Sequence, residues 1–480
     1  MQKKLLLLSF VEGAAVMAAE LCGAKLLAPV FGSSLYVWAS VMGITLAALA
    51  GGYFFGGWIS EKSNQYSLNL YRILAIASLF LLSMPLLSYY VVPRISYLPF
   101  LPGVIFSTFL VLFLPVFFLG ATSPLFILLQ TKQSLEAGKV SGTVYAVSTV
   151  GGIFATFLCG FYLIPTIGLN ACLLFFGGVL FIVNFIVFKF FNPAHFFLVI
   201  SFAYLNFQFI QKKGDYLMGS DSILGRVEVK DIKGFNNKSY RILTVNDIVQ
   251  TEMDIETKSS LSKYVSLVDT LVPNSIGPKK ALLLGLGGGL IANLLESKNY
   301  RTDGVELDER IIEAAKKFFF LNENVNTFYE DARYFLNKCE ENYSVVMVDV
   351  FKGEEQPSHV LTKESLEKIK TNLSDSGLIL INWHGYISGK NGTGTAILYN
   401  TLIKSGFNVK LCSYSNDENY RNVLFVASLS KLSTLPFELH EQIQETNLIN
   451  SDKFPLLEKY NAEANKAWRL NYLRYYQSGN

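Results

Sequence analysis

Residues 280–289 read KALLLGLGGG, and this stretch decides the fold. Its first half is a continuous apolar run, which is typical of a parallel strand buried on both faces. Its second half is a glycine turn, and Leu290 to Ser297 continue with a helical pattern. A strand, a glycine turn and a helix in this order allow a backbone to approach a nucleoside closely, because glycine leaves no side chain in the way. Such a turn also occurs where a helix begins without any bound ligand. The strands that follow must therefore distinguish a nucleoside site from an ordinary start of a helix.

Three further strands are predicted, and each has a carboxylate at or just after its end. The strand RTDGVELD contains Glu306 about 20 residues after the glycines, where an acidic side chain can accept hydrogen bonds from both ribose hydroxyls. The short strand NTFY precedes Asp331, whose carboxylate can accept from an adenine amino group, and the strand YSVVMV ends at Asp349. Open α/β sheets bind ligands beyond the carboxyl ends of their strands. These residues therefore predict an adenosyl-binding site.

The average composition of the chain describes neither of its halves. Of 480 residues, 51% are apolar and 16% are charged, whereas soluble globular proteins carry about 25% charged residues. Charges are sparse up to residue 211 and dense afterwards. We therefore expect a multi-span helical membrane domain at residues 1–211, followed by a soluble α/β half. The net charge of +3 is small and the basic residues are scattered, so we expect no nucleic-acid partner.

The predicted membrane domain contains seven candidate spans, which are punctuated by glycine and proline. They are residues 5–27, 35–58, 68–92, 104–130, 142–164, 169–189 and 194–211. Basic residues in alternate loops predict a cytoplasmic amino terminus. Seven crossings would then place the soluble half outside, whereas adenosyl cofactors are intracellular. The seventh segment is short and contains Asn206 and Gln208, so whether it crosses is left open.

The soluble half divides into three predicted parts. Residues 212–275 form a linker and a small β-hairpin region, since 225–232 and 240–250 alternate apolar and polar residues as half-buried strands do. Residues 276–430 form a Rossmann-like domain of the adenosylmethionine methyltransferase type. Residues 431–480 are expected to be a docking tail, to which we assign no chemistry.

The order of these motifs resembles that of the spermidine synthase family of aminopropyltransferases. The whole chain is similar to the bacterial membrane-integrated members, in which a transporter-like half is fused to the synthase. In the membrane half the matching stretches are LLAPVFGSSLYVWASVMG from residue 26 and YAVSTVGGIFATFLCGFYLIPTIG from residue 145. In the soluble half they are SILGRVEV, VNDIVQ, GLGGG, GVELDERIIEAAKKFF, EDARYFL, VMVDVF and HVLTKESLEKIK.

This resemblance implies roles for individual residues. Asp349 would be the catalytic proton acceptor for the attacking amine. Glu306 would hold the ribose of the co-substrate, decarboxylated S-adenosylmethionine, and Asp331 would lie at its adenine. The full set implied for the co-substrate is Gly285, Gly287, Gly289, Glu306, Asp331 and Ala332. The set implied for the acceptor substrate is Gln250, Tyr264 and Tyr420.

The resemblance also implies the setting of the reaction. The acceptor would be a small amine such as putrescine, and a homodimer is compatible with the family. No metal is expected, and the five cysteines show no CxxC spacing that would indicate a zinc site. The expected location is the bacterial inner membrane, with the catalytic domain on the cytoplasmic side.

The sequence departs from the soluble family members around the amine. These members have a second aspartate three residues after the catalytic one, where Lys352 stands, and an aspartate within the glycine turn, where Gly288 stands. They have a glutamine where Val265 stands. The lost groups normally hold amine ends, so the nucleoside site is retained while the amine site is rebuilt. Glu354 and Glu355 either replace the missing carboxylates or form an exposed acidic loop.

Two other functions are left open. Methyl transfer from S-adenosylmethionine relies mostly on positioning, so it would not need the missing aspartates. A polyamine transporter, or a sensor that binds without turnover, is motivated by Glu12 and Glu20, which lie near one face of the first span. The competing explanation is a Glu20–Lys25 pair with Glu12 hydrogen-bonded inside the bundle. His359 and His384 lie near strand ends and are either packing residues or catalysts.

Overall fold

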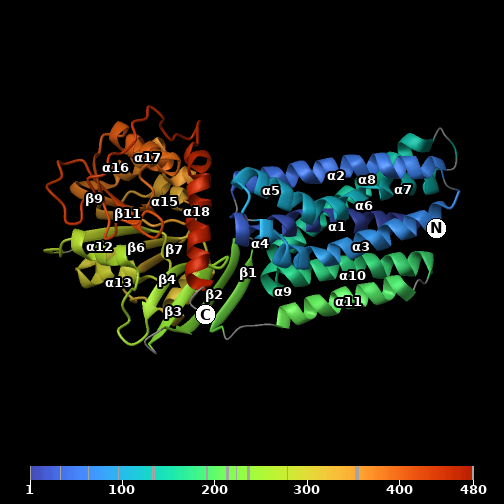
Figure 1. The fold of residues 1–480 in the computed structure, drawn as a ribbon, viewed down its shortest axis with the longest axis horizontal. Helices are drawn as coiled ribbons and strands as arrows, with labels where there is room; N and C mark the ends of the chain where they lie inside the picture. Colours follow the sequence, from blue (N-terminus) through green and yellow to red (C-terminus); the bar gives the residue numbers. More distant parts are fainter. Residues whose placement is uncertain are drawn as a thin grey trace. The chain divides into compact units, whose positions relative to one another are not determined.

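The computed structural model describes residues 2–477, apart from residues 33, 63, 96, 132, 134–135, 191–192, 212–215, 223, 235–237, 278 and 352–355. The chain divides into two compact units. Unit 1 comprises Met1–Gly214 and Ser220–Gly225, and unit 2 comprises Asp215–Gly219 and Arg226–Asn480. Unit 1 is helical, whereas unit 2 is built of sheets and helices (Figure 1).

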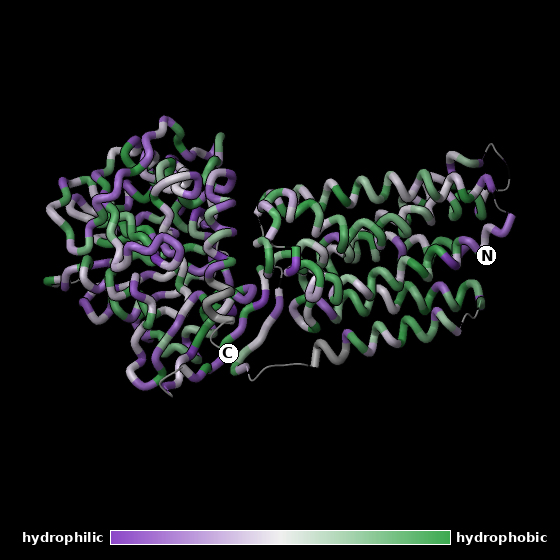
Figure 2. The backbone as a smooth tube through the Cα atoms, viewed as in Figure 1, coloured by the Kyte–Doolittle hydropathy of each residue, from purple (hydrophilic) through white to green (hydrophobic). Residues whose placement is uncertain are grey.

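Unit 1 is a bundle of apolar helices. Its helices are α1 (Gln2–Phe31), α2 (Leu35–Lys62), α3 (Tyr66–Tyr90), α4 (Val92–Ile95), α5 (Phe100–Thr108), α6 (Leu114–Gly120), α7 (Thr122–Gln130), α8 (Ala137–Leu158), α9 (Ile164–Ile167), α10 (Leu169–Phe188) and α11 (Pro193–Gln211). Short π-helical segments, Phe109–Phe113 and Cys159–Leu163, join α5 to α6 and α8 to α9. Figure 2 shows that these helices are mainly apolar along their length.

Six stretches within the described residues are long and apolar enough to cross a membrane, by length and composition alone. They are Gln2–Phe31, Leu35–Lys62, Tyr66–Tyr90, Phe100–Gln130, Ala137–Ile167 and Leu169–Phe188. They coincide with the first six candidate spans. The seventh candidate lies in α11, whose apolar stretch, Pro193–Asn206, is shorter.

Helix α11 nevertheless belongs to the bundle. It packs against α3 and α10, and the side-chain amide of Asn206 donates to the carbonyl of Leu82 in α3 at 2.9 Å. A buried amide needs a hydrogen-bond partner, and the packing of α11 on α3 supplies one. Because Asn206 is hydrogen-bonded within the bundle, its polarity does not exclude a seventh crossing by α11.

Helices α1 and α8 approach each other closely enough for backbone contact. A Cβ atom at Gly13 would lie 2.0 Å from the carbonyl oxygen of Ser148, and one at Gly151 would lie 2.0 Å from that of Phe10. Only residues without a side chain permit this spacing. The close approach also lets the Ser148 hydroxyl donate to Glu12 Oε2 at 2.9 Å, and Glu12 is only 3% exposed.

Unit 2 contains most of a small sheet. Its strands are β1 (Met218–Ser222), of which only Met218 and Gly219 belong to unit 2, β2 (Gly225–Lys233), β3 (Ser239–Val245) and β4 (Ile248–Asp254). Strands β2, β3 and β4 pair antiparallel. The prediction of one strand over residues 240–250 is wrong. Asn246 and Asp247 have φ values of 50° and 65° and reverse the chain. Asn and Asp tolerate this left-handed region better than other side chains, so they form a two-residue hairpin turn.

The second sheet of unit 2 has seven strands in the order β10-β11-β9-β8-β5-β6-β7. They are β5 (Lys279–Leu284), β6 (Tyr300–Glu306), β7 (Asn326–Tyr329), β8 (Tyr343–Val348), β9 (Leu373–His384), β10 (Asn408–Cys412) and β11 (Asn422–Ser428). Strands β5 to β9 pair in parallel, whereas β11 runs antiparallel to β9 and β10 antiparallel to β11. This topology confirms the predicted Rossmann-like domain of the methyltransferase type.

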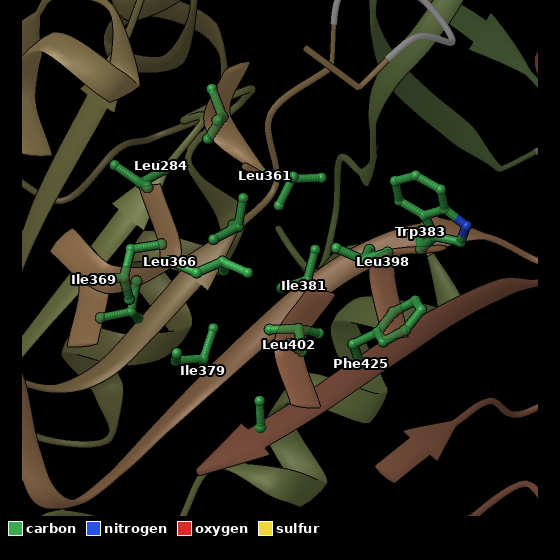
Figure 3. Packing of buried hydrophobic residues seen from close by; sticks show 14 of the residues in the cluster. Leu284, Leu361, Leu366, Ile369, Ile379, Ile381, Trp383, Leu398, Leu402 and Phe425 are labelled. Carbon is green, nitrogen blue, oxygen red and sulfur yellow. The ribbon is translucent and has the colours of Figure 1, made fainter. Parts of the chain in front are cut away.

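Helices cover both faces of this sheet. They are α12 (Lys263–Leu271), α13 (Leu290–Ser297), α14 (Glu309–Phe318), α15 (Ala332–Lys338), α16 (Lys363–Thr371) and α17 (Thr393–Lys404), and α18 (Leu457–Gln477) ends the unit. Figure 3 shows one of the two packed layers, in which side chains of β9 and β11 meet those of α16 and α17. The labelled members of these four elements are Ile379, Ile381, Trp383, Phe425, Leu366, Ile369, Leu398 and Leu402.

The alternation of side chains along β8 and β9 decides which residues meet beyond the sheet. Leu380 and Met347 pack in the opposite layer, with α12 and α13, and they are register partners. Residues two apart in a strand share a face. Asn382 therefore lies on the same face as Leu380, and Asp349 on the same face as Met347.

Candidate active site

Asp349 follows β8 at the point where the strand order reverses between β5 and β8, which is where sheets of this type bind ligands. The Tyr264 hydroxyl donates to its Oδ2 at 2.9 Å, and the Asn382 amide donates to its Oδ1 at 2.7 Å. The Asn422 amide donates to Asn382 Oδ1 at 3.0 Å and so fixes the orientation of the Asn382 amide. Each oxygen of Asp349 has one donor and keeps a further lone pair for a ligand.

The surroundings of Asp349 suit a general base. Burial raises the pKa of Asp349 to about 6, against the lowering effect of the hydrogen bonds from Asn382 and Tyr264. Burial, together with the charge of Asp349, raises the pKa of Tyr264 well above its usual value, so the phenol remains a donor. A carboxylate of this kind is mostly ionised at neutral pH and is more basic than an exposed one. It can therefore accept a proton from a reacting group.

Glu306 is tied to the glycine turn. Its Oε2 accepts from the backbone N–H of Leu286 at 3.1 Å, and its Oε1 accepts from that of Asp308 at 3.1 Å. Burial raises the pKa of Glu306 to about 7. The backbone N–H of Gly287 also favours the ionised form of this carboxylate. The role of Glu306 at a ribose stays a prediction.

The glycine turn lies against Asp349. Gly285, Gly287 and Gly289 have φ values of 89°, 52° and 77°, a region that favours glycine. A Cβ atom at Gly285 would lie 2.2 Å from the carbonyl oxygen of Asp349, and one at Gly289 would lie 2.5 Å from Leu321 Cδ1. The chain's own packing therefore requires these glycines. The same packing brings the predicted nucleoside turn and the predicted proton acceptor together.

Strand β4 also contacts this turn. The backbone N–H of Gly288 donates to Thr251 Oγ1 at 2.7 Å. A Cβ atom at Gly288 would lie 2.6 Å from Thr251 Cγ2 and 3.1 Å from the Phe319 ring. The aspartate of the soluble family members therefore does not fit here. No motif in the sequence marks Thr251, which follows Gln250 directly.

Asp331 begins α15 and contacts a histidine. Its Oδ1 caps the helix by accepting from the backbone N–H groups of Arg333 and Tyr334 at 2.8 Å and 3.1 Å, and Oδ2 lies 3.0 Å from His359 Nε2. His359 and these backbone donors hold the pKa of Asp331 below its usual value. Ala332 is 6% exposed. His359 therefore supports the carboxylate predicted to lie at the adenine.

The three residues predicted for the acceptor substrate occupy different settings. Tyr264 contacts Asp349, as described above. Gln250 lies in β4, next to Thr251, and its side-chain amide donates to the carbonyl of Ile248 at 3.4 Å. Tyr420 lies in the β10–β11 loop and is 59% exposed. Their roles stay predictions, and Lys352, Glu354 and Glu355 lie outside the described residues.

His384 ends β9 on the same face as Asn382. Its ring stacks on Trp468 of α18, with centroids 4.5 Å apart and planes at 25°. The Phe351 ring lies 5.5 Å from it. No motif in the sequence marks the tail that contains Trp468, so this contact could not be predicted.

Two further predictions concern charged groups: the expected lack of a metal site, and the Glu20–Lys25 pair in the first span. Among the described residues, no group of three or more His, Cys, Asp or Glu side chains could hold a metal ion. In unit 1, Lys25 Nζ lies 5.8 Å from the centroid of the Trp38 ring.

Known proteins are similar to this same part of unit 2. The profile of the spermine/spermidine synthase domain matches residues 262–384, which include Glu306 and Asp349. The chain is 26% identical over 220 residues to the polyamine aminopropyltransferase of Vibrio vulnificus, which covers 43% of this chain and 70% of that protein. It is 32% identical over 136 residues to the N-terminal histidine N-methyltransferase of Emericella nidulans, covering 27% of this chain but only 24% of that protein.

A probable spermidine synthase from Corynebacterium glutamicum superposes with a TM-score of 0.39 at 16% identity, covering 46% of this chain and 82% of that one.

Unit 2 thus contains an α/β domain of the adenosylmethionine methyltransferase type. Within that class, residues 262–384 form a spermidine synthase domain, an enzyme domain of the aminopropyltransferase kind. The same chain carries six apolar helices, among its described residues, that are long enough for a membrane-spanning segment.

Proposed function

We propose that the chain is a membrane-bound polyamine aminopropyltransferase. It transfers an aminopropyl group from decarboxylated S-adenosylmethionine to an amine such as putrescine. The observation that carries the proposal is the Asp349 carboxylate, which is held by Tyr264 and Asn382 directly beside the glycine turn. The match of the surrounding segment to the spermine/spermidine synthase domain supports the same reaction.

The co-substrate would be held by its nucleoside. Glu306 accepts hydrogen bonds from the ribose hydroxyls, with the acceptor capacity that its oxygens keep beside the backbone donors Leu286, Gly287 and Asp308. Asp331, supported by His359, accepts from the adenine amino group. The sulfonium then lies near Asp349, since the Asp349 backbone packs against Gly285.

The transfer itself needs one base and no acid. The amine nitrogen attacks the aminopropyl carbon next to the sulfonium, so the new C–N bond forms as the C–S bond breaks. The bonding electrons leave with sulfur as a neutral thioether, methylthioadenosine, which needs no proton. Asp349 takes the proton that the amine nitrogen loses, and its two donors keep the carboxylate aligned for this role.

Methyl transfer is the second candidate. Two observations favour methyl transfer. The chain is similar to a histidine N-methyltransferase, and its amine site is rebuilt. The two reactions leave different nucleosides, because aminopropyl transfer releases methylthioadenosine and methyl transfer releases S-adenosylhomocysteine.

Mass spectrometry of reaction products separates these candidates. Full-length protein in detergent is incubated with either decarboxylated or ordinary S-adenosylmethionine and a panel of amines. We expect methylthioadenosine and an amine enlarged by one aminopropyl group, with the decarboxylated co-substrate only. Formation of S-adenosylhomocysteine and a methylated amine would overturn the proposal in favour of methyl transfer.

We propose a place in the bacterial inner membrane, with the catalytic domain on the cytoplasmic side. Six crossings return the chain to the side on which it started, whereas a crossing by α11 would reverse this. Impermeant maleimide labelling of Gln2→Cys and Lys431→Cys variants in intact cells tests the side. We expect both cysteines to react only after permeabilisation, and labelling of Lys431→Cys in intact cells would contradict this topology.

We do not propose transport. Glu12 is buried and accepts a hydrogen bond from Ser148, which is what the purely structural explanation of this carboxylate requires. Polyamine flux into proteoliposomes that disappears in a Glu12→Gln variant would reverse this assignment.

A further inference from the structure

We infer that residues 450–452 of the carboxyl-terminal tail hold Asp331 in the position in which it selects a 6-amino purine over a 6-oxo purine. They act through His359 and Arg333, which contact Asp331 directly. The inference rests on the proposed function, because it takes the place of Asp331 at the adenine from there. The tail residues lie outside residues 262–384, which match the synthase domain.

The two oxygens of Asp331 have different acceptor capacity left. Oδ1 accepts from the backbone N–H groups of Arg333 and Tyr334, and these two bonds occupy both of its lone pairs. Oδ2 lies 3.0 Å from His359 Nε2. Because the carboxylate is ionised and can only accept, the histidine is the donor. Oδ2 keeps one further lone pair, and since the side chain is 35% exposed, a donor on a ligand can reach it.

Asn450 fixes the turn that carries His359. It is fully buried, and its side-chain amide donates to the backbone carbonyls of Ser358 and Leu361 at 3.1 Å and 2.9 Å. Its Oδ1 atom accepts from the Ser358 hydroxyl at 3.1 Å. These three bonds hold the short helical turn Ser358–Val360 at both ends. Since His359 lies between the two anchored residues, its backbone is fixed, and its ring is presented to the carboxylate.

Asp452 fixes the residue that donates to the other oxygen. Its Oδ2 accepts from the Arg333 guanidinium at 3.0 Å, and its Oδ1 accepts from the Thr362 hydroxyl at 2.7 Å. The Thr362 hydroxyl in turn accepts from Arg333 Nη1 at 3.0 Å, so the three side chains form a closed network. The backbone N–H of Arg333 is one of the two donors to Asp331 Oδ1. The tail therefore holds a donor to each oxygen of Asp331.

A carboxylate held in this way discriminates between purines. The amino group of adenine is a donor, and Oδ2 can accept from it. A 6-oxo purine has a carbonyl oxygen at the same position, so two acceptors would face each other and neither would have a partner. The discrimination requires a fixed carboxylate, because one that is free to turn loses its bond to the amino group and can avoid the carbonyl oxygen.

Calorimetric titration of the full-length protein in detergent measures this selectivity without requiring turnover. The protein is titrated with methylthioadenosine and with methylthioinosine, its 6-oxo analogue. We expect the wild type to bind methylthioadenosine at least about tenfold more tightly than methylthioinosine. This ratio of affinities should fall at least about threefold in His359→Ala and in Asp452→Ala. His359→Gln keeps a donor at this position and should retain most of the ratio.

His440→Ala and Glu445→Ala are the matched controls, because both residues are exposed and lie in the same tail, and their ratios should equal that of the wild type. An unchanged ratio in His359→Ala or Asp452→Ala, including equal weakening of both nucleosides, would overturn the inference. Asn450→Ala should also lower the ratio. Should it bind neither nucleoside, Asp452→Ala decides, since that side chain is 49% exposed. Failure of the wild type to bind methylthioadenosine would instead reject the proposed function itself.

Discussion

The hydroxyl of Tyr264 donates to Asp349 Oδ2 at 2.9 Å, although the two residues are 85 positions apart in the chain. Tyr264 lies in the first turn of α12, and Asp349 follows β8. The bond therefore joins the helix that opens the synthase domain to the strand end that carries its base. It also stabilises the ionised form of a carboxylate whose burial favours the neutral form.

The pH dependence of the reaction should report Asp349. Because its raised pKa is about 6, the carboxylate is protonated below that pH and cannot accept a proton. With saturating co-substrate, kcat/KM for the amine should fall about tenfold per pH unit below about 6. Initial rates between pH 4.5 and 8 check this. A rate that stays constant down to pH 4.5 would show that Asp349 is not the base.

Removing the Tyr264 hydroxyl should shift the pH at which kcat/KM begins to fall. In Tyr264→Phe the charged form of Asp349 loses a donor, so the pKa of Asp349 rises, by about one unit. The midpoint of the pH profile should shift to higher pH by that amount. Tyr334→Phe, at a position that is 61% exposed, should leave the midpoint unchanged. A shift to lower pH in Tyr264→Phe would contradict the role given to this bond.

Glu306 should govern nucleoside affinity. In Glu306→Gln one acceptor oxygen becomes a donor, so the side chain can no longer accept from both Leu286 and Asp308 and from two ribose hydroxyls. We expect methylthioadenosine binding to weaken about 10- to 100-fold by calorimetric titration. Glu309→Gln, at an exposed position of the next helix, should bind as the wild type does. Equal affinities of the two variants would remove Glu306 from the site.

Restoring the aspartate of the soluble family members at position 288 should damage the fold. A side chain there meets Thr251 at 2.6 Å and Phe319 at 3.1 Å, so Gly288→Asp should destabilise unit 2 by about 2–4 kcal/mol. Thermal unfolding measures this. Gly219→Ala is the control, because nothing lies within 4 Å of its added Cβ. An unchanged transition in Gly288→Asp would mean that the turn and β4 separate readily.

The sequence was sufficient to predict the residues that follow strands. Glu306 ends β6 and Asp349 follows the apolar run of β8, and the carboxyl ends of parallel strands lie at one edge of a sheet, so their proximity follows from local patterns. Asn382 was missed although it interrupts the apolar run of β9. Its contact with Asp349 depends on β9 pairing with β8 in a particular register, which no local pattern specifies.

Two other features were beyond sequence reasoning for related reasons. The turn at Asn246 and Asp247 is only two residues long, so the apolar alternation continued across it and concealed the break between β3 and β4. Trp468 lies in a tail without a motif. Its stacking on His384 depends on where α18 packs, and that is set by contacts far apart in the chain.

The most direct test compares product formation by the wild type and Asp349→Asn, with decarboxylated S-adenosylmethionine and an accepted amine. Asparagine keeps the size of the side chain but cannot take the proton. We predict that methylthioadenosine release falls about 100- to 10,000-fold, while methylthioadenosine binding is unchanged. Release at the wild-type rate by Asp349→Asn would contradict the assignment of Asp349 as the proton acceptor.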